Sequence, residues 1–234
     1  MRKKENIIII GASSSVGNEI ISRFKSPTTR IIATYNSKQN YKHNVNLSSL
    51  KLDLNNNESI ENFINELKSV VSHIDTAIFL AGILPGKNLK EYILKDMEEV
   101  MTINFTGQAK VIKGLLPLFD CDSQILMISS ISAQRGSYDP IYAASKGAIL
   151  SFVKSIANGL GGTRVNAIAP GLIEDSAMFN EMSIERREFH RQQKSNKQLL
   201  DISDFSRIIF DLSRNHWKHL NGACIDLNAG QYVR

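Results

Sequence analysis

Short apolar runs alternate with longer amphipathic stretches along almost the whole chain, and this alternation constrains the fold more than any other feature. The apolar runs are rich in β-branched residues, which is typical of strands buried on both faces of a parallel sheet. These runs are Asn6–Ile10, Arg30–Thr34, Thr76–Leu80, Gln124–Ser129, Arg164–Ala169 and Ala223–Leu227. The stretches whose apolar residues have helical spacing are Val16–Lys25, Ser59–Val71, Asp96–Phe119, Tyr142–Leu160 and Ser203–Ser213.

Regular alternation of strands and helices predicts an α/β fold, here a Rossmann-type doubly wound parallel sheet with helices on both faces. The 234 residues suffice for one large domain with a sizeable core. No linker or repeat divides them, so we expect a single domain over residues 1–234. The segment from about Leu172 to Leu200 is polar and has no strand pattern, and we expect it to form a mobile lid.

The formal net charge is +5, but the basic residues are spread along the chain except in a denser stretch, Arg186–Lys197. This favours an enzyme that binds phosphate-bearing molecules over a nucleic-acid-binding protein. The two cysteines, Cys121 and Cys224, belong to no cluster with metal-ligand spacing, so we expect no metal and a reducing compartment. The apolar run near the start stops at Gly11, which is too short for a signal core or a membrane span. We therefore expect a cytoplasmic protein without membrane contact.

A turn of small residues joins the first predicted strand to the first predicted helix. Glycine lets the backbone approach a ligand closely, and the free amides and dipole of a helix N-terminus favour a phosphate. The turn departs from the G-x-G-x-x-G pattern, and a purely structural role is an equally good interpretation. The candidate cofactor-binding residues in it are Gly11, Ser13, Ser14, Ser15, Val16 and Gly17.

The residues after the second predicted strand bear on the choice of cofactor. An acidic residue there binds the ribose hydroxyls of NAD, whereas polar and basic groups accept the additional phosphate of NADP. The chain has no acid at this position and continues with Asn36, Ser37 and Lys38. We therefore expect NADP as the cofactor, with NAD as the alternative. A solvated loop with no ligand is the other interpretation.

Tyr142 and Lys146 lie four residues apart at the start of a predicted helix, which places them on one face, one turn apart. An ammonium group there would stabilise a phenolate and let a tyrosine, with an ordinary pKa of about 10, exchange protons at neutral pH. Most such pairs lie on a solvated helix face. Here, however, the preceding strand ends in Ser129 and Ser130, at the sheet edge where ligands of α/β proteins bind. This context favours a catalytic pair.

Taken together, these features resemble the short-chain dehydrogenases/reductases, and most closely the bacterial 3-oxoacyl-[acyl-carrier-protein] reductases. The resemblance covers nearly the whole chain, with the motifs in the family's order. The segments that carry it are Gly11–Gly17, Lys51–Leu54, Leu80–Gly82, Ile103–Gly107, Ser130, Tyr142–Lys146, Val165–Gly171 and Leu220–Gly230. Beyond the turn and the second strand, it implies that Asp53, Leu54, Ala81, Gly82, Tyr142, Lys146, Pro170, Gly171 and Ile173 bind the cofactor.

The resemblance also implies a catalytic set of Asn104, Ser130, Tyr142 and Lys146. Tyr142 would give a proton to a ketone oxygen while the cofactor delivers a hydride, and Lys146 would lower the tyrosine pKa and hold the ribose. Ser130 would hydrogen-bond the substrate oxygen, and Asn104 would position a water that relays protons behind Lys146. The interval between Ser130 and Tyr142 is one residue shorter than the commonest pattern, which makes Ser129 an alternative.

Four positions depart from the family's pattern, and all bear on cofactor affinity. Ile10 replaces a threonine, Ser15 replaces the middle glycine of the turn, and Leu80 replaces an asparagine. Asp175 stands where a threonine usually contacts the cofactor, and a carboxylate there would repel a phosphate unless it turned away.

The substrate implied by the resemblance is a 3-oxoacyl thioester on acyl-carrier protein, reduced to a secondary alcohol. The basic residues Arg186, Arg187, His190, Arg191, Lys194 and Lys197 could meet that acidic carrier, although a solvated lid helix is the simpler interpretation. Another small carbonyl compound or a sugar is the alternative substrate. A different class of protein, a non-catalytic cofactor-binding scaffold, finds its only support in the altered glycine turn.

Two predicted helices carry more apolar residues than one sheet face covers, which usually marks an interface. The residues are Ile149, Phe152, Val153, Ile156 and Leu160 in one helix, and Val100, Ile103, Val111, Ile112, Leu115 and Leu116 in the other. The family resemblance implies that both helices pair with their copies across a two-fold axis. We therefore expect a homotetramer or a homodimer. The alternative is that both helices pack only within the chain.

Overall fold

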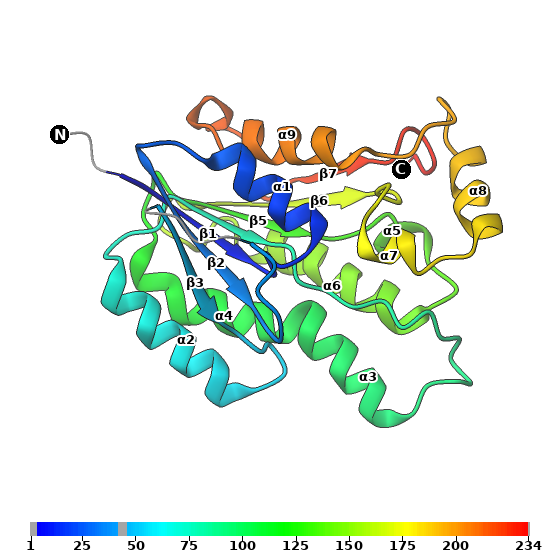
Figure 1. Ribbon diagram of the computed structural model, residues 1–234, viewed down its shortest axis with the longest axis horizontal. Coiled ribbons are helices and arrows are strands. Elements are labelled where there is room, and N and C mark those ends of the chain that lie inside the picture. The colour runs from blue at the N-terminus through cyan, green and yellow to red at the C-terminus, as the bar shows by residue number, and fades with distance from the viewer. Residues whose placement is uncertain (1–3, 42–45, 234) are drawn as a thin grey trace.

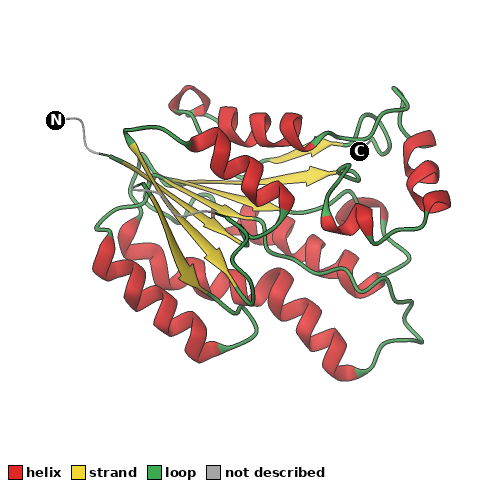
Figure 2. Ribbon diagram, viewed as in Figure 1, coloured by secondary structure: helices red, strands yellow, loops and turns green. Residues whose placement is uncertain are grey.

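The computed structural model describes residues 4–41 and 46–233, and its centre is a seven-stranded parallel sheet (Figures 1 and 2). The strands are β1 (Glu5–Ile10), β2 (Thr29–Tyr35), β3 (Leu47–Lys51), β4 (Thr76–Phe79), β5 (Gln124–Ile128), β6 (Arg164–Pro170) and β7 (Cys224–Leu227). Their order is β3-β2-β1-β4-β5-β6-β7, so the direction of winding reverses between β1 and β4. This arrangement confirms the predicted doubly wound α/β fold.

Helices cover both faces of the sheet, which explains why the strand sequences are apolar without a polar alternation (Figure 2). In β1, Ile7 and Ile9 belong to the core beneath α1 and α9, whereas Ile8 and Ile10 belong to the core beneath α2, α4 and α6. All four side chains are at most 1% exposed. These helices are α1 (Ser15–Phe24), α2 (Asn57–Val70), α4 (Gly107–Leu115), α6 (Pro140–Ile156) and α9 (Ile202–Leu212).

Strand β3 was absent from the sequence prediction, because its sequence gives little signal. Leu47–Lys51 reads Leu-Ser-Ser-Leu-Lys, and only Leu47 and Leu50 are buried. The strand pairs with β2 alone, at the edge of the sheet. Short edge strands with polar residues are common, since they do not invite further pairing.

The predicted helix Asp96–Phe119 is interrupted by a wide turn. It comprises α3 (Leu94–Met101), a π-helical segment η1 (Thr102–Thr106), α4, and a short 3-10 segment η2 (Leu116–Leu118). At the end of η1 the amide of Gly107 donates to the Thr102 carbonyl, five residues back. Such π turns often occur at functional sites, and this one holds Asn104 in the interior.

The segment predicted as a lid contains two short helices, α7 (Ala177–Asn180) and α8 (Ile184–Gln192). Its two ends meet at a parallel bridge between Ile173 and Leu200. In Figure 1 it projects from the carboxyl end of the sheet, on the same side as the short helix α5 (Ser132–Arg135). Among the described residues, no helix combines the length and apolarity needed to cross a membrane.

We predict that Gly107→Ala lowers the free energy of unfolding by about 1–3 kcal/mol, although alanine favours a helix over glycine by about 1 kcal/mol. The added Cβ would lie 2.5 Å from the Leu54 carbonyl oxygen and 2.9 Å from that of Thr102, both of them main-chain atoms. Gly114→Ala, in the same helix, is the matched control, since its Cβ would meet only the side chain of Ile64. Urea denaturation measures both variants, and equal stability of the two would contradict the prediction.

Candidate active site

The N-terminal end of α6 brings Tyr142 and Lys146 together at the carboxyl edge of the sheet. The helix starts with Asp139 as its cap and Pro140 in its first turn, an arrangement that fixes a helix N-terminus. Tyr142 is 6% exposed and Lys146 3%. The Lys146 ammonium lies 5.8 Å from the centre of the tyrosine ring, so the two side chains share one helix face as predicted from their four-residue spacing.

The two serines at the end of β5 have different surroundings. Ser130 is the hydrogen-bond partner of the Tyr142 side chain, and its Oγ also accepts from the Ser132 amide at 3.1 Å. Ser129 Oγ donates to the Lys146 carbonyl at 2.8 Å and is buried. Ser130 is therefore placed beside the phenol, whereas the Ser129 hydroxyl fastens β5 to α6.

Asn104 and Lys146 face each other across Gly82. The ammonium of Lys146 donates to the Ile128 carbonyl at 2.9 Å. A Cβ on Gly82 would lie 3.2 Å from that ammonium and 3.3 Å from Asn104 Oδ1, so glycine keeps the space between them open. Asn104 is held by both main-chain groups of Ile83, at 2.8 and 3.0 Å.

The amide of Asn104 is almost fully engaged within the protein. Its Nδ2 donates to Ser145 Oγ at 2.9 Å as well as to the Ile83 carbonyl. One lone pair of Oδ1 is taken by the Ile83 amide, and an amide oxygen has a second one. One acceptor site on Oδ1 therefore remains, and the proton-relaying water that we expect could donate to it.

Burial dominates the electrostatics of the pair. It lowers the pKa of Lys146 to about 8, because a charged ammonium is poorly solvated in the interior. Burial also raises the pKa of Tyr142, the hydrogen bond with Ser130 lowers it, and the charge of Asp139 raises it. The sequence analysis predicted that Lys146 lowers the pKa of Tyr142, but burial, which raises this pKa, has the larger effect. The ammonium is bound to the Ile128 carbonyl instead.

A cavity of about 210 Å³ connects the start of α1 with the catalytic residues. Its predicted cofactor and catalytic residues are Ser14, Val16, Gly82, Ser130, Tyr142, Lys146, Pro170, Gly171 and Ile173. The rest of the wall is largely apolar and includes Leu84, Ile131, Met178, Met182 and Phe205, together with the polar side chains of Arg135 and His190. Leu84 and Ile131 lie in loops and Met178 and Met182 in the lid, where no periodic pattern marks a side chain as pocket-facing. Arg135 and Phe205 come from α5 and α9.

The turn after β1 fits a dinucleotide. Gly11 has a φ of 84°, and a Cβ there would lie 2.7 Å from backbone atoms of Ala81. A Cβ on Gly17 would overlap the main chain of Ala12, so only glycine lets α1 start this close to the sheet. Ser14 caps the helix by accepting from the Gly17 amide at 3.0 Å, and both Ser14 and Val16 line the cavity. A helix N-terminus that opens onto a cavity is a suitable anion site.

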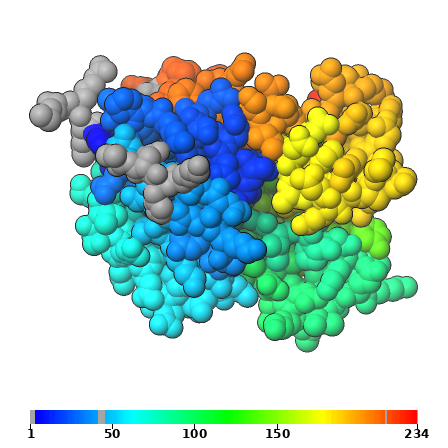
Figure 3. Space-filling model, viewed as in Figure 1, coloured from blue at the N-terminus to red at the C-terminus, as the bar shows by residue number. Residues whose placement is uncertain are grey.

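The lid contacts this turn directly. Ser15 Oγ donates to the Asp175 carbonyl at 3.0 Å, and Asp175 has a left-handed φ of 58°. Ser176 caps α7 and lines the cavity. On the face shown in Figure 3, the yellow lid segment lies against the dark blue segment around α1.

The other predicted cofactor residues lie along the same edge. Asn36 and Ser37 follow β2 and are exposed, and Asp53 and Leu54 follow β3. None of these four lines the cavity. Ser13 belongs to the turn after β1, where its carbonyl accepts from Asn40.

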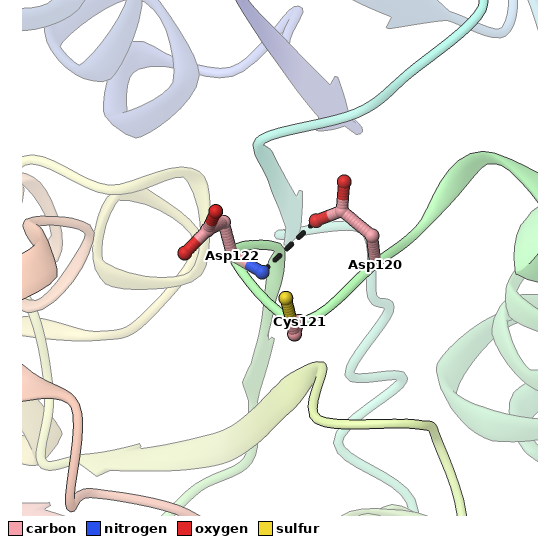
Figure 4. Close-up of side chains that lie close together, drawn as sticks. All are labelled: Asp120, Cys121 and Asp122. Carbon is pink, nitrogen blue, oxygen red and sulfur yellow. Dashed lines mark hydrogen bonds between the residues drawn. The ribbon is translucent and has the colours of Figure 1, made fainter.

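A second group of polar side chains lies at the opposite edge of the sheet. The ligand atoms of Asp120, Cys121 and Asp122 fall within 4.8 Å of one another, and all three residues are exposed (Figure 4). The Asp122 amide donates to the Asp120 carboxylate at 2.9 Å, as the dashed line in Figure 4 shows. His73 Nδ1 lies 3.3 Å from the same carboxylate. The arrangement closes the turn before β5, far from Tyr142.

Comparisons with known proteins agree with this geometry. Residues 11–231 match a family model described as enoyl-(acyl carrier protein) reductase. The chain is 25% identical over 239 residues to the 3-oxoacyl-[acyl-carrier-protein] reductase FabG of Aquifex aeolicus, covering 96% of each chain. It is 28% identical over 244 residues to the FabG of Buchnera aphidicola subsp. Baizongia pistaciae, covering 98% of each.

Among solved structures, a short-chain dehydrogenase/reductase of the glucose/ribitol dehydrogenase type from Brucella melitensis superposes with a TM-score of 0.92. Its sequence is 25% identical, and the match covers 99% of this chain and 98% of that one. The family model, the order of the sheet and the site at its carboxyl edge all agree. The chain therefore belongs to the short-chain dehydrogenase/reductase family of oxidoreductases.

Proposed function

We propose that the protein reduces a ketone to a secondary alcohol with NADPH, or catalyses the reverse reaction, as a single domain. The observation that carries this proposal is the meeting of Ser130, Tyr142 and Lys146 in one cavity whose other end is the N-terminus of α1. A bound reduced nicotinamide would supply a hydride to the carbonyl carbon. The turn with Ser14 and Val16 would hold the pyrophosphate.

The side chains would handle the proton. Tyr142 donates its phenolic proton to the carbonyl oxygen, and Ser130 donates a hydrogen bond to the same oxygen. Lys146, whose pKa burial lowers to about 8, is still largely protonated at neutral pH and stabilises the phenolate that remains. Asn104 holds the loop after β4 against α6 and so keeps Lys146 facing Gly82.

As the substrate we propose a 3-oxoacyl thioester on acyl-carrier protein. The apolar wall with Ile131, Met178 and Met182 suits an acyl chain, and the FabG relatives carry that activity in their names. Arg186 and His190, on the lid, line a groove beside the cavity and would face an acidic carrier. Another small carbonyl compound or a sugar is the second candidate, since Arg135 and His190 add polar groups to the cavity wall.

A panel of carbonyl compounds that includes a 3-oxoacyl thioester, run with NADPH and NADH in parallel, tests the proposal. We predict that Tyr142→Phe reduces turnover of the best substrate by at least about a hundredfold, the scale of general acid catalysis, without loss of the fold by circular dichroism. Tyr232→Phe, at a tyrosine outside the cavity, should keep its activity. Near-normal turnover by Tyr142→Phe would contradict the assignment. Nucleotide binding with no ketone reduced by the wild type would favour a scaffold instead.

For the cofactor we predict a preference for NADPH, because no acid follows β2 while Asn36, Ser37 and Lys38 are exposed there. Placing a carboxylate at the same point with Ser37→Asp should shift the preference towards NADH, since it would repel the additional phosphate. The measurement is kcat/KM with each cofactor for both proteins. A wild-type kcat/KM with NADH about tenfold above that with NADPH would overturn the assignment.

Fewer apolar residues of α4 and α6 are free to form the proposed interface than the sequence suggested. Val111, Ile112, Leu115, Ile149 and Val153 are buried in the core against the sheet, and Val100 of α3 is buried as well. Leu116 is still 39% exposed, and the edge-to-face pair of Phe105 and Phe152, with ring centres 5.5 Å apart, is only partly buried. These residues support a homodimer or homotetramer whose interface includes the outer face of α6.

Light scattering at micromolar concentration should give a dimer or tetramer mass. We predict that Phe152→Asp shifts this mass towards the monomer, because a carboxylate in an apolar contact loses its hydration. Val70→Asp, at a partly exposed apolar residue at the end of α2, is the matched control and should leave the mass unchanged. A monomer mass for the wild type would rule the assembly out.

A further inference from the structure

The carboxylate of Asp139 lies beneath the start of α6 and is only 1% exposed. Its Oδ1 accepts from the Tyr142 amide at 2.9 Å and from the Tyr92 hydroxyl at 2.7 Å. Its Oδ2 accepts from the amides of Gly86 and Lys87 at 3.0 and 3.3 Å. Four donors from two segments thus converge on one buried group.

All four donors are uncharged, which is unusual for a buried carboxylate. Among the described residues, no lysine, arginine or histidine forms an ion pair with Asp139, and the ammonium of Lys87 pairs with Asp96 instead. The negative charge is therefore stabilised by hydrogen bonds and by the dipole at the start of α6. Only an ionised carboxylate accepts from all four donors without turning a hydroxyl towards one of them.

The two segments that Asp139 joins are the two sides of the site. One is the first turn of α6, which carries Tyr142. The other is the loop before α3, where Leu84 lines the catalytic cavity and Pro85 and Gly86 line the groove beside it. Tyr92, at the far end of this loop, is buried, and its hydroxyl joins that end of the loop to Asp139.

We propose that Asp139 is a positioning residue for the reaction: it fixes the substrate-facing loop relative to Tyr142, and its buried charge opposes the ionisation of Tyr142 before the substrate is bound. This inference rests on the proposed role of Tyr142 as the proton donor. The electrostatics agree, since burial raises the pKa of Tyr142 and the charge of Asp139 raises it further, while the Ser130 hydrogen bond opposes them.

Other ionisable groups also border the tyrosine. Lys146 lies one turn along α6, Tyr92 shares the Asp139 carboxylate, and Arg135 of α5 and His190 of α8 line the same cavity. A test must therefore isolate the contribution of Asp139. The variant Asp139→Asn removes the charge and keeps the shape, and asparagine also caps a helix well.

The first measurement is a titration of Tyr142 by the ultraviolet absorbance of tyrosinate, taken as the difference between each protein and its Tyr142→Phe counterpart. We predict that Asp139→Asn ionises Tyr142 about half to one pH unit below the wild type, a three- to tenfold larger ratio of phenolate to phenol. Asp201→Asn is the matched control, because Asp201 caps α9 in the same way and away from Tyr142. An unchanged titration in a folded Asp139→Asn would overturn the proposal.

The second variant, Tyr92→Phe, keeps the charge and removes one of the four hydrogen bonds. We expect a severalfold higher KM for the carbonyl substrate, with the ionisation of Tyr142 unchanged. An unchanged KM would overturn the positioning role, and this variant decides the matter if Asp139→Asn fails to fold. The titration needs no substrate, so its result stands even if the proposed reaction is wrong.

Discussion

The attachment of α6 to the carboxyl edge of the sheet is the constraint on which the site depends. Two hydrogen bonds hold it there: Ser129 Oγ to the Lys146 carbonyl, and the Lys146 ammonium to the Ile128 carbonyl. Each of them joins a side chain to a main-chain group. The main chain at the end of β5 therefore fixes where α6 places Tyr142 and Lys146.

Close backbone contacts provide the second constraint. Gly11, Gly17 and Gly107 each lie where a Cβ would overlap main-chain atoms, and the contacts join β1, α1 and α4 to their neighbours. Gly17 thus has a packing role that is independent of any cofactor, which explains why the turn retains it while Ser15 departs from the family pattern. The serine side chain is used differently, in a hydrogen bond to the lid.

The sequence predicted most of the sheet because the central strands can be recognised from their own apolar residues. The alternating isoleucines of β1 are buried on both faces and need no knowledge of their neighbours. The pairing of Tyr142 with Lys146 was predictable for the same reason, since helical geometry alone sets it. By contrast, β3 carries only two leucines, and its strand character comes from its partner β2. The π turn at Asn104 is likewise fixed by contacts with Ile83 and Ser145, which are distant in sequence.

Asp139 has one role that the sequence could predict and one that it could not. An aspartate followed by proline is a familiar sign of a helix start, so its capping role was accessible from the sequence. Its bonds to Tyr92 and Gly86 were not, because they span about fifty residues of chain. The choice between Ser129 and Ser130 was also open, since adjacent residues of a strand point to opposite faces and spacing alone did not fix which one meets the phenol.

The bridge between Ile173 and Leu200 has an evolutionary consequence. Because the lid leaves and rejoins the body at neighbouring points, insertions or deletions between them alter neither the sheet nor the catalytic helix, and the entropy of closing the loop changes only slowly with its length. Two wall residues of the cavity, Met178 and Met182, lie inside this excursion. The range of accepted substrates can thus diverge while the chemistry beneath it is inherited unchanged.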